Sequence, residues 1–241
     1  MIMAGAANAA DLPLKAPRSP APIAAPAFSW TGCYVGANAG YGWGHNEVTR
    51  THSQTFFSCC APPNTQQNDA DPGIDPHGGI FGGQVGCNYQ FASNWVFGVE
   101  GSFAGAHISG SVVDPLNAAG VVSVNTDALG SVVVRLGYTT WNNQLMLYAK
   151  GGAAGVENKW NSTVVGSFTE DRLGWTVGAG LEWAFAPRWS VFGEYDHYGF
   201  NSGGTTVTTA NSVAATVDTL SSGKQRIDAV RFGVNYKFLG P

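Results

Sequence analysis

The sequence predicts an all-β fold, an eight-stranded antiparallel up-and-down transmembrane β-barrel with short turns at one end and long loops at the other. Three observations favour this fold. Only 12% of the residues are charged, about half the usual fraction, so much of the outer surface is expected to face something other than water. The hydrophobic fraction is an ordinary 44%, and no run approaches the roughly 20 apolar residues of a membrane-spanning helix. Finally, apolar and polar residues alternate along several segments.

The N-terminal region lacks this alternation. Residues 1–9 end in Ala7-Asn8-Ala9, a small-residue pattern of the kind that signal peptidase cuts, and they predict the stub of a signal peptide with a truncated start. A disordered, alanine-rich N-terminus is the alternative. Residues 10–28 carry a series of prolines and predict an extended periplasmic linker, which leaves the barrel domain to residues 29–241.

The first barrel segment shows the alternation most simply. Apolar or small residues occupy every odd position from Cys33 to Trp43, and Gly or Asn occupies nearly every even position between them. This run is longer than a typical soluble strand and suits a tilted strand that crosses a membrane. The same period of two predicts strands over residues 33–44, 81–91, 95–103, 132–138, 145–150, 173–185, 189–195 and 232–238.

Connections between these segments alternate in length. Tight turns are expected at 92–94, 141–143 and 186–188, and long polar loops at 46–76, 108–125, 161–169 and 202–225. Short periplasmic turns and long extracellular loops are typical of outer-membrane barrels. Aromatic residues beside the short turns predict a belt at the membrane interface, and they are Trp30, Trp95, Trp141, Trp183, Trp189 and Tyr236. The alternative, a water-soluble barrel such as a lipocalin, would need a charged exterior.

Three segments resemble a known family. Residues 30–44, WTGCYVGANAGYGWG, resemble the first strand of the small outer-membrane β-barrel proteins, which include OmpA-like barrels and porin-family surface antigens of Gram-negative bacteria. Residues 230–238, VRFGVNYKF, resemble their last strand, and Ala10-Asp11-Leu12-Pro13 resembles their mature N-terminus. The resemblance implies a location in the cell outer membrane.

The resemblance also implies partners. It implies insertion by the barrel-assembly machinery, with Tyr236 and Phe238 in the recognition signal, although residues 239–241 follow where many family members stop. Outer-membrane lipid and lipopolysaccharide are the expected surroundings, and attachment of the N-terminus at Ala10-Asp11 to peptidoglycan is a hypothesis. The net charge of −4 argues against nucleic acid as a partner. No oligomeric state follows from the sequence.

Charged residues on the strands are expected to point into the barrel, because the apolar faces touch lipid. Counted from the periplasmic strand ends, they predict one layer of three acids and three bases, formed by Glu100, Arg135, Lys150, Glu182, Glu194 and Arg231. An eight-stranded barrel has an interior only wide enough for side chains to fill, so a neutral charge layer would act as a plug. The alternative is a path for ions or protons through the same residues.

The cysteines suggest a disulfide. Cys33 and Cys87 lie near the periplasmic ends of two neighbouring antiparallel strands, where cross-strand distances permit a bridge in an oxidising compartment. The adjacent Cys59 and Cys60 of the first long loop could form a vicinal disulfide or bond outside the chain, and the sequence does not choose between these pairings.

No metal site, cofactor site or catalytic site is expected. His45, His52 and His77 border the loop that carries Cys59 and Cys60, but their spacing matches no standard zinc pattern. His197 is close in sequence to Glu194 and Asp196, yet alternation directs the histidine outward and both acids inward. The chain has no phosphate loop, nucleophile elbow or dinucleotide signature.

Three function classes remain. The first is a structural outer-membrane protein that contributes to envelope integrity and presents surface loops. The second is a porin-like channel for small solutes, although an open pore usually needs about twice as many strands. The third is a surface-binding or adhesion protein that acts through loops 46–76 and 202–225.

Overall fold

The structure is a computed structural model that describes residues 28–58, 61–70, 73–113, 121–162, 166–205 and 215–240. Its ten strands are β1 (Gly32–Ser58), β2 (Ala61–Ala70), β3 (His77–Phe91), β4 (Trp95–Val113), β5 (Val121–Thr140), β6 (Leu145–Ser162), β7 (Gly166–Ala186), β8 (Trp189–Phe200), β9 (Gly203–Thr205) and β10 (Ala215–Leu239). The predicted signal-peptide stub (1–9), nearly all of the linker (10–28), and Cys59 and Cys60 lie outside the described residues.

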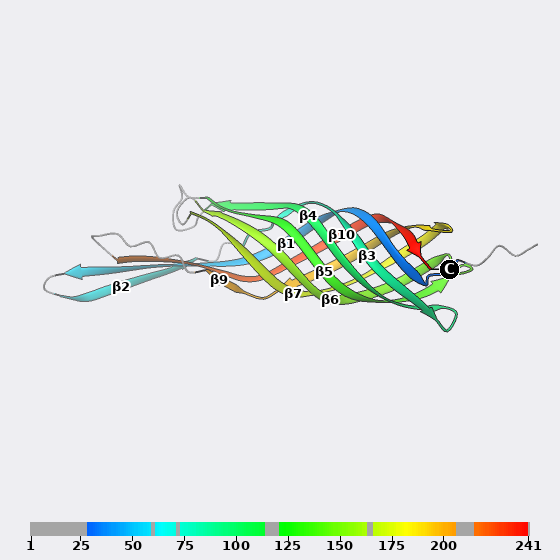
Figure 1. Cartoon of the computed structure of the whole chain (residues 1–241). Helices are drawn as coiled ribbons and strands as arrows, with labels where there is room; N and C mark the ends of the chain where they lie inside the picture. The colour runs from blue at the N-terminus through cyan, green and yellow to red at the C-terminus, as the bar shows by residue number, and fades with distance from the viewer. Residues whose placement is uncertain are drawn as a thin grey trace, which may run out of the picture.

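Eight of these strands close into a barrel. Their order is β1-β3-β4-β5-β6-β7-β8-β10, every neighbouring pair is antiparallel, and β1 also pairs with β10 to close the ring (Figure 1). The prediction of an eight-stranded antiparallel up-and-down barrel is therefore confirmed. Over the described part of the chain, no helix has the length and apolar character needed to cross a bilayer.

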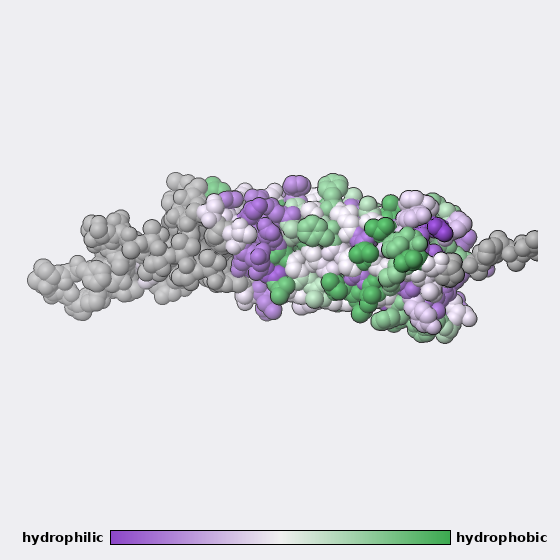
Figure 2. All heavy atoms as spheres, viewed as in Figure 1, coloured by the Kyte–Doolittle hydropathy of each residue, from purple (hydrophilic) through white to green (hydrophobic). Residues whose placement is uncertain are grey.

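The outer surface of the barrel is mostly apolar, the reverse of a water-soluble barrel. Phe81 and Val132 are 63% and 69% exposed, whereas the neighbouring Ile80 and Val133 point inward and are buried. Hydrophobic residues gather over the half of the barrel that ends at the short turns, and a hydrophilic zone follows toward the other end (Figure 2). Strands with one apolar and one buried polar face suit a wall between lipid and a filled interior.

The two ends of the barrel differ, and we call them the turn rim and the loop rim. The turn rim carries the connections at 92–94, 141–144 and 187–188, together with the C-terminal end of β10 (Figure 1). Trp141, Asn142 and Asn143 all adopt positive φ angles of 48°, 53° and 70°. Ala92 and Ser93 of the first turn also have positive φ angles, of 47° and 64°, which help a tight turn to follow the twist of its strands.

The strands run farther beyond the loop rim than the sequence predicted. Strand β1 continues to Ser58 and pairs there with both β2 and β10, and β9 adds to the other side of β10. β5 and β6 pair as far as Val122 and Ser162, so most of the predicted loops 46–76, 108–125, 161–169 and 202–225 are strand where they are described. Backbone hydrogen bonds, which residues of any type can form, hold these ladders together. The segments were not predicted to be strands because their sequences lack a regular alternation of apolar and polar residues.

Five of the six aromatic residues predicted for the interfacial belt lie on the outer surface at the turn rim. Trp95, Trp141, Trp183 and Trp189 are exposed, and the ring of Tyr236 packs against that of Trp189 at 4.9 Å. Trp30 differs, because it is only 3% exposed and lies inside the barrel mouth. The prediction that Trp30 belongs to the belt is therefore wrong: the segment before β1 turns into the lumen.

Candidate functional site

Alternation along the strands brings charged side chains together inside the barrel. Each of six strands, β4 to β8 and β10, contributes one of the residues predicted for the lumen layer, and all six side chains are nearly inaccessible to solvent. They are Glu100, Arg135, Lys150, Glu182, Glu194 and Arg231. The layer therefore contains side chains from six of the eight strands of the barrel wall.

Arg135 is the centre of the half nearer the turn rim. Its guanidinium lies 3.1 Å from Glu100 Oε2 and 2.8 Å from Glu182 Oε2. Tyr34 accepts a hydrogen bond from Arg135 and donates one of 2.5 Å to Glu100, while the guanidinium carbon lies 4.0 Å from the ring centroid of Tyr148. The arginine thus meets two carboxylates and an aromatic face, which compensates for the water it has lost.

Lys150 and Arg231 organise the other half. The ammonium of Lys150 lies 2.7 Å from Glu194, 3.0 Å from Asp196 and 3.8 Å from Glu100. Arg231 donates from Nε and Nη2 to Asp196 at 2.9 and 2.6 Å, and its Nη2 lies 3.0 Å from Glu194. Every base therefore contacts at least two acids, and the two halves meet at Glu100.

Asp196 makes the layer different from the predicted one. Its side chain is completely buried between Lys150 and Arg231, so the network contains four acids and three bases instead of three of each. The alternation of apolar and polar residues along β8 already places Asp196 on the inward face. This pattern could have identified Asp196 as a further member of the charge layer. As fully ionised groups, these seven side chains would carry one excess negative charge.

Neutral polar side chains complete the network. Ser190 and Asn235 donate to Glu182 Oε1 at 2.5 and 2.8 Å, and Tyr148 donates to Glu194 at 2.8 Å. Gln84 continues the chain from Asn235 to Asn38, with hydrogen bonds of 2.7 and 2.6 Å. The sequence analysis did not select these residues, because Asn, Gln and Tyr on an inward face carry no charge to count.

An apolar plug closes the lumen at the turn rim. Trp30 packs with Val96, Met146 and Ala184, and its ring lies in edge contact with Phe28 at 4.9 Å. The indole nitrogen of Trp30 donates to the backbone oxygen of Asn143 at 2.9 Å. The cavity between this plug and Glu182 is only about 20 Å³, room for a single water molecule.

A second apolar layer closes the lumen on the loop side of the charges. Ile80, Ile108 and Ile227 are completely buried there and pack with Tyr198 and Phe200. Beyond them, Asn158 accepts from Thr126 and donates to Gln225, both at 2.8 Å, and a cluster of Ile74, Val124 and Trp160 follows. Ile108 and Ile227 fall in segments predicted to be loops or left between predicted strands, so the sequence did not reveal this layer.

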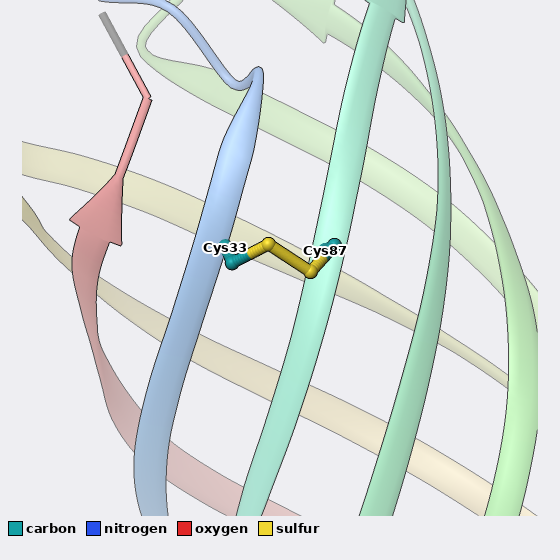
Figure 3. The surroundings of a disulfide bond; sticks show 2 residues. All are labelled: Cys33 and Cys87. Carbon is teal, nitrogen blue, oxygen red and sulfur yellow. A yellow bond between two sulfur atoms is a disulfide. The ribbon is translucent and has the colours of Figure 1, made fainter.

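Cys33 and Cys87 form a disulfide in the structure. They are direct partners in the ladder between β1 and β3, and their sulfur atoms are 2.03 Å apart (Figure 3). The bridge lies near the end of β10, close to the turn rim (Figure 3). It links strands whose residues are 54 positions apart in the sequence.

His197 has a partner that the sequence analysis missed. Alternation directs it outward, as predicted, where its Nδ1 lies 2.6 Å from Asp228 Oδ1 on β10. Tyr195 donates to the same carboxylate oxygen at 2.6 Å. Asp228 was not found because its position opposite His197 depends on the register between β8 and β10.

The remaining predicted residues can be placed as follows. Phe238 lies exposed near the end of β10, two residues after Tyr236, and their role in assembly stays a prediction. His45 and His77 come together at the loop rim, but nowhere in the described ranges do three or more metal-ligating side chains form a group that could hold an ion. The side chain of His52 is outside the described part of the structure.

Comparison with known proteins agrees with this architecture. The family profile of the outer membrane protein beta-barrel domain matches residues 3–238. The 31 kDa outer-membrane immunogenic protein of Brucella melitensis is 31% identical over 245 residues, covering 98% of this chain and 95% of the relative. The 25 kDa outer-membrane immunogenic protein of Brucella canis is 30% identical over 242 residues, covering 96% and 91%.

Solved structures show a more distant likeness. The outer membrane protein OprG of Pseudomonas aeruginosa is 13% identical, with a TM-score of 0.46 over 88% of this chain and 99% of that one. Ail, the attachment invasion locus protein of Yersinia pestis, is 16% identical, with a TM-score of 0.40 over 86% and 99%. On the strength of the profile and the Brucella relatives, the chain belongs to the outer-membrane β-barrel protein family and is located in the outer membrane.

Proposed function

We propose that the protein is a non-conducting structural barrel that contributes to the integrity of the outer membrane and presents a β-sheet above it. The observation that carries this proposal is the filled lumen. A charge network lies between the apolar plug around Trp30 and the apolar layer around Ile80, Ile108 and Ile227. Ions would have to displace both apolar layers to pass, and each layer is packed with buried side chains.

The charge network supports the same role. Its ion pairs join side chains from β4, β5, β6, β7, β8 and β10, so they hold strands together across the lumen as well as along the ladders. A porin-like channel for small solutes is the less favoured function, since the same residues that could select ions are bound to one another. The polar side chains of the network are buried away from any substrate, which favours a non-enzymatic role.

Surface recognition is a second candidate, favoured by the sheet beyond the loop rim. Strands β2, β1, β10 and β9 lie side by side there and extend the barrel wall (Figure 1). The Brucella relatives are named outer-membrane immunogenic proteins, which supports a surface role for the present chain. Assembly through Tyr236 and Phe238, and attachment of the N-terminus to peptidoglycan, remain proposals.

Single-channel recording of the refolded protein in a planar bilayer tests the non-conducting barrel. The wild-type protein should be silent. Steady conductance would contradict the proposal and would make Glu100, Arg135 and Lys150 selectivity residues.

Two sets of variants sharpen the recording. Trp30→Ala combined with Ile80→Ala, Ile108→Ala and Ile227→Ala thins both apolar layers and should produce openings if these layers are the seal. The matched control removes side chains from the lipid-facing wall, with Val132→Ala and Val134→Ala, and should stay silent. All variants should first show the heat-dependent shift in electrophoretic mobility of a folded barrel.

A further inference from the structure

A hollow on the outside of the barrel gathers polar side chains at an unusual place. It has a volume of about 640 Å³ and lies at the loop-rim end of β1, β3 and β10. Its walls include Tyr41 and Trp43, and its polar groups are His45, Asp75, His77, Arg226 and Asp228. The hollow is on the outer surface of the wall, so it is separate from the lumen network.

The height of this hollow corresponds to the headgroup region of the outer leaflet. Trp43 lies about ten residues along β1 from Cys33, and strands tilted at roughly 45° cross the apolar part of a membrane in about 9–11 residues. Tyr41 and Trp43 are half exposed on the outer face, as interfacial aromatic residues are. The polar groups of the hollow lie beside these rings and beyond the lipid-facing Phe81 of β3.

The carboxylates of the hollow already have partners. Asp75 Oδ1 lies 2.6 Å from Nδ1 of His45, and Asp228 Oδ1 lies 2.6 Å from both Nδ1 of His197 and the hydroxyl of Tyr195. Within the described part of the chain, the guanidinium of Arg226 has no ion-pair partner. An exposed arginine at the headgroup level is therefore left without an anion.

We propose that this hollow binds a phosphate group of the lipopolysaccharide in the outer leaflet, with Arg226 as its principal ligand. Guanidinium groups bind phosphate oxygens through paired, charge-assisted hydrogen bonds. The rings of Tyr41 and Trp43 offer an apolar wall with polar edges, which fits the sugar and the first methylene groups of a phosphorylated glycolipid. The membrane supplies this ligand at the height of the site.

The two histidines of the hollow lie against Asp75. The Nδ1 atom of His45 lies 2.6 Å from the carboxylate of Asp75, and that of His77 lies 3.4 Å from its backbone oxygen. The carboxylate of Asp75 is therefore engaged by His45, and Arg226 is the cation of the hollow that remains open to a ligand.

Binding of purified lipopolysaccharide to the refolded protein in phosphatidylcholine nanodiscs tests the proposal. A fluorescent lipopolysaccharide and its dephosphorylated form are each titrated with these nanodiscs. Wild-type protein should bind the phosphorylated form more tightly. Arg226→Gln should weaken binding of the phosphorylated form by about tenfold or more, the effect of losing a charge-assisted hydrogen bond.

A control variant tests whether the loss of any loop-rim cation has the same effect. Lys159→Gln is the matched control, because it removes a loop-rim cation from β6 on the opposite wall, where Lys159 is paired with Asp127 at 2.6 Å. This control should bind like the wild-type protein.

The proposal fails if Arg226→Gln binds as tightly as the wild-type protein, or if both forms of lipopolysaccharide bind equally well. It also fails if inorganic phosphate at equal concentration displaces the glycolipid, because the hollow would then recognise phosphate from any source.

Discussion

Replacing Lys150 with methionine tests whether the lumen network stabilises the barrel. The substitution keeps most of the side-chain volume and removes the cation that contacts Glu194, Asp196 and Glu100 at 2.7, 3.0 and 3.8 Å. It leaves the four acids of the network with Arg135 and Arg231 as their only bases. The ammonium is almost completely buried, so water cannot replace it without opening the wall.

The expected loss is about 3–5 kcal/mol in the free energy of unfolding, the cost of removing one partner from a buried ion pair. Urea titration of the barrel folded in phospholipid vesicles, followed by tryptophan fluorescence from both the folded and the unfolded side, measures it. The added substitution Asp196→Asn should recover part of the loss, because it removes one of the uncompensated carboxylates. The double-mutant cycle then gives the coupling energy of Lys150 and Asp196.

Lys159→Met is the matched control. Lys159 also forms an ion pair, with Asp127 at 2.6 Å, but both side chains are exposed at the loop rim. Water replaces such a partner readily, so little change is expected. If Lys150→Met costs no more than Lys159→Met, or if Asp196→Asn adds to the loss, the network does not stabilise the barrel in the way described.

Two further variants test the packing of the lumen and the disulfide. Gly178→Ala should destabilise the barrel by about 1–3 kcal/mol, the usual cost of overpacking, because a Cβ atom there would lie 2.2 Å from Asp196 Oδ1 and 2.6 Å from the backbone oxygen of Tyr195. Gly101→Ala is the control, because nothing lies within 4 Å of its Cβ position. Equal urea midpoints for the two variants would contradict this packing. The double variant Cys33→Ser with Cys87→Ser should lose about 4 kcal/mol by the loop-closure relation for a separation of 54 residues; mass spectrometry without reductant should find the pair bonded in the wild-type protein, and two free thiols there would contradict the structure.

Alternation with a period of two was sufficient to predict the barrel because each strand has one face toward lipid. That requirement determines which residues point inward, and it was enough to assign Glu100, Arg135 and Lys150 to the lumen from the sequence alone. It could not show which inward residues touch. Asp196 lay on the correct face of β8, but its contact with Lys150 depends on the registers of β6, β7 and β8 together.

Other parts of the lumen were hidden for different reasons. Ile108 and Ile227 lie where the outer face has become polar, so the pattern that identifies a lipid-facing strand had already ended. Trp30 precedes the first strand, and no periodicity governs a segment that folds back into the barrel mouth. The pairing of His197 with Asp228 joins two strands that the sequence separates by a long connection, so only the closed barrel brings them together.

The bridge between Cys33 and Cys87 also acts on the way the ring of strands is completed. Because these residues are opposite each other in the β1–β3 ladder, an oxidised chain can pair these two strands in a single register. A slip of one residue elsewhere would exchange the lipid-facing and lumen-facing sides of a strand. The other edge of β1 pairs with β10, in a ladder that begins at Leu239 and closes the barrel. The disulfide between β1 and β3 is therefore one strand away from the pair at which the barrel closes. The disulfide therefore fixes the register between β1 and β3. Strand β10 then has to pair with β1 in the matching register for Arg231 to reach its acidic partners.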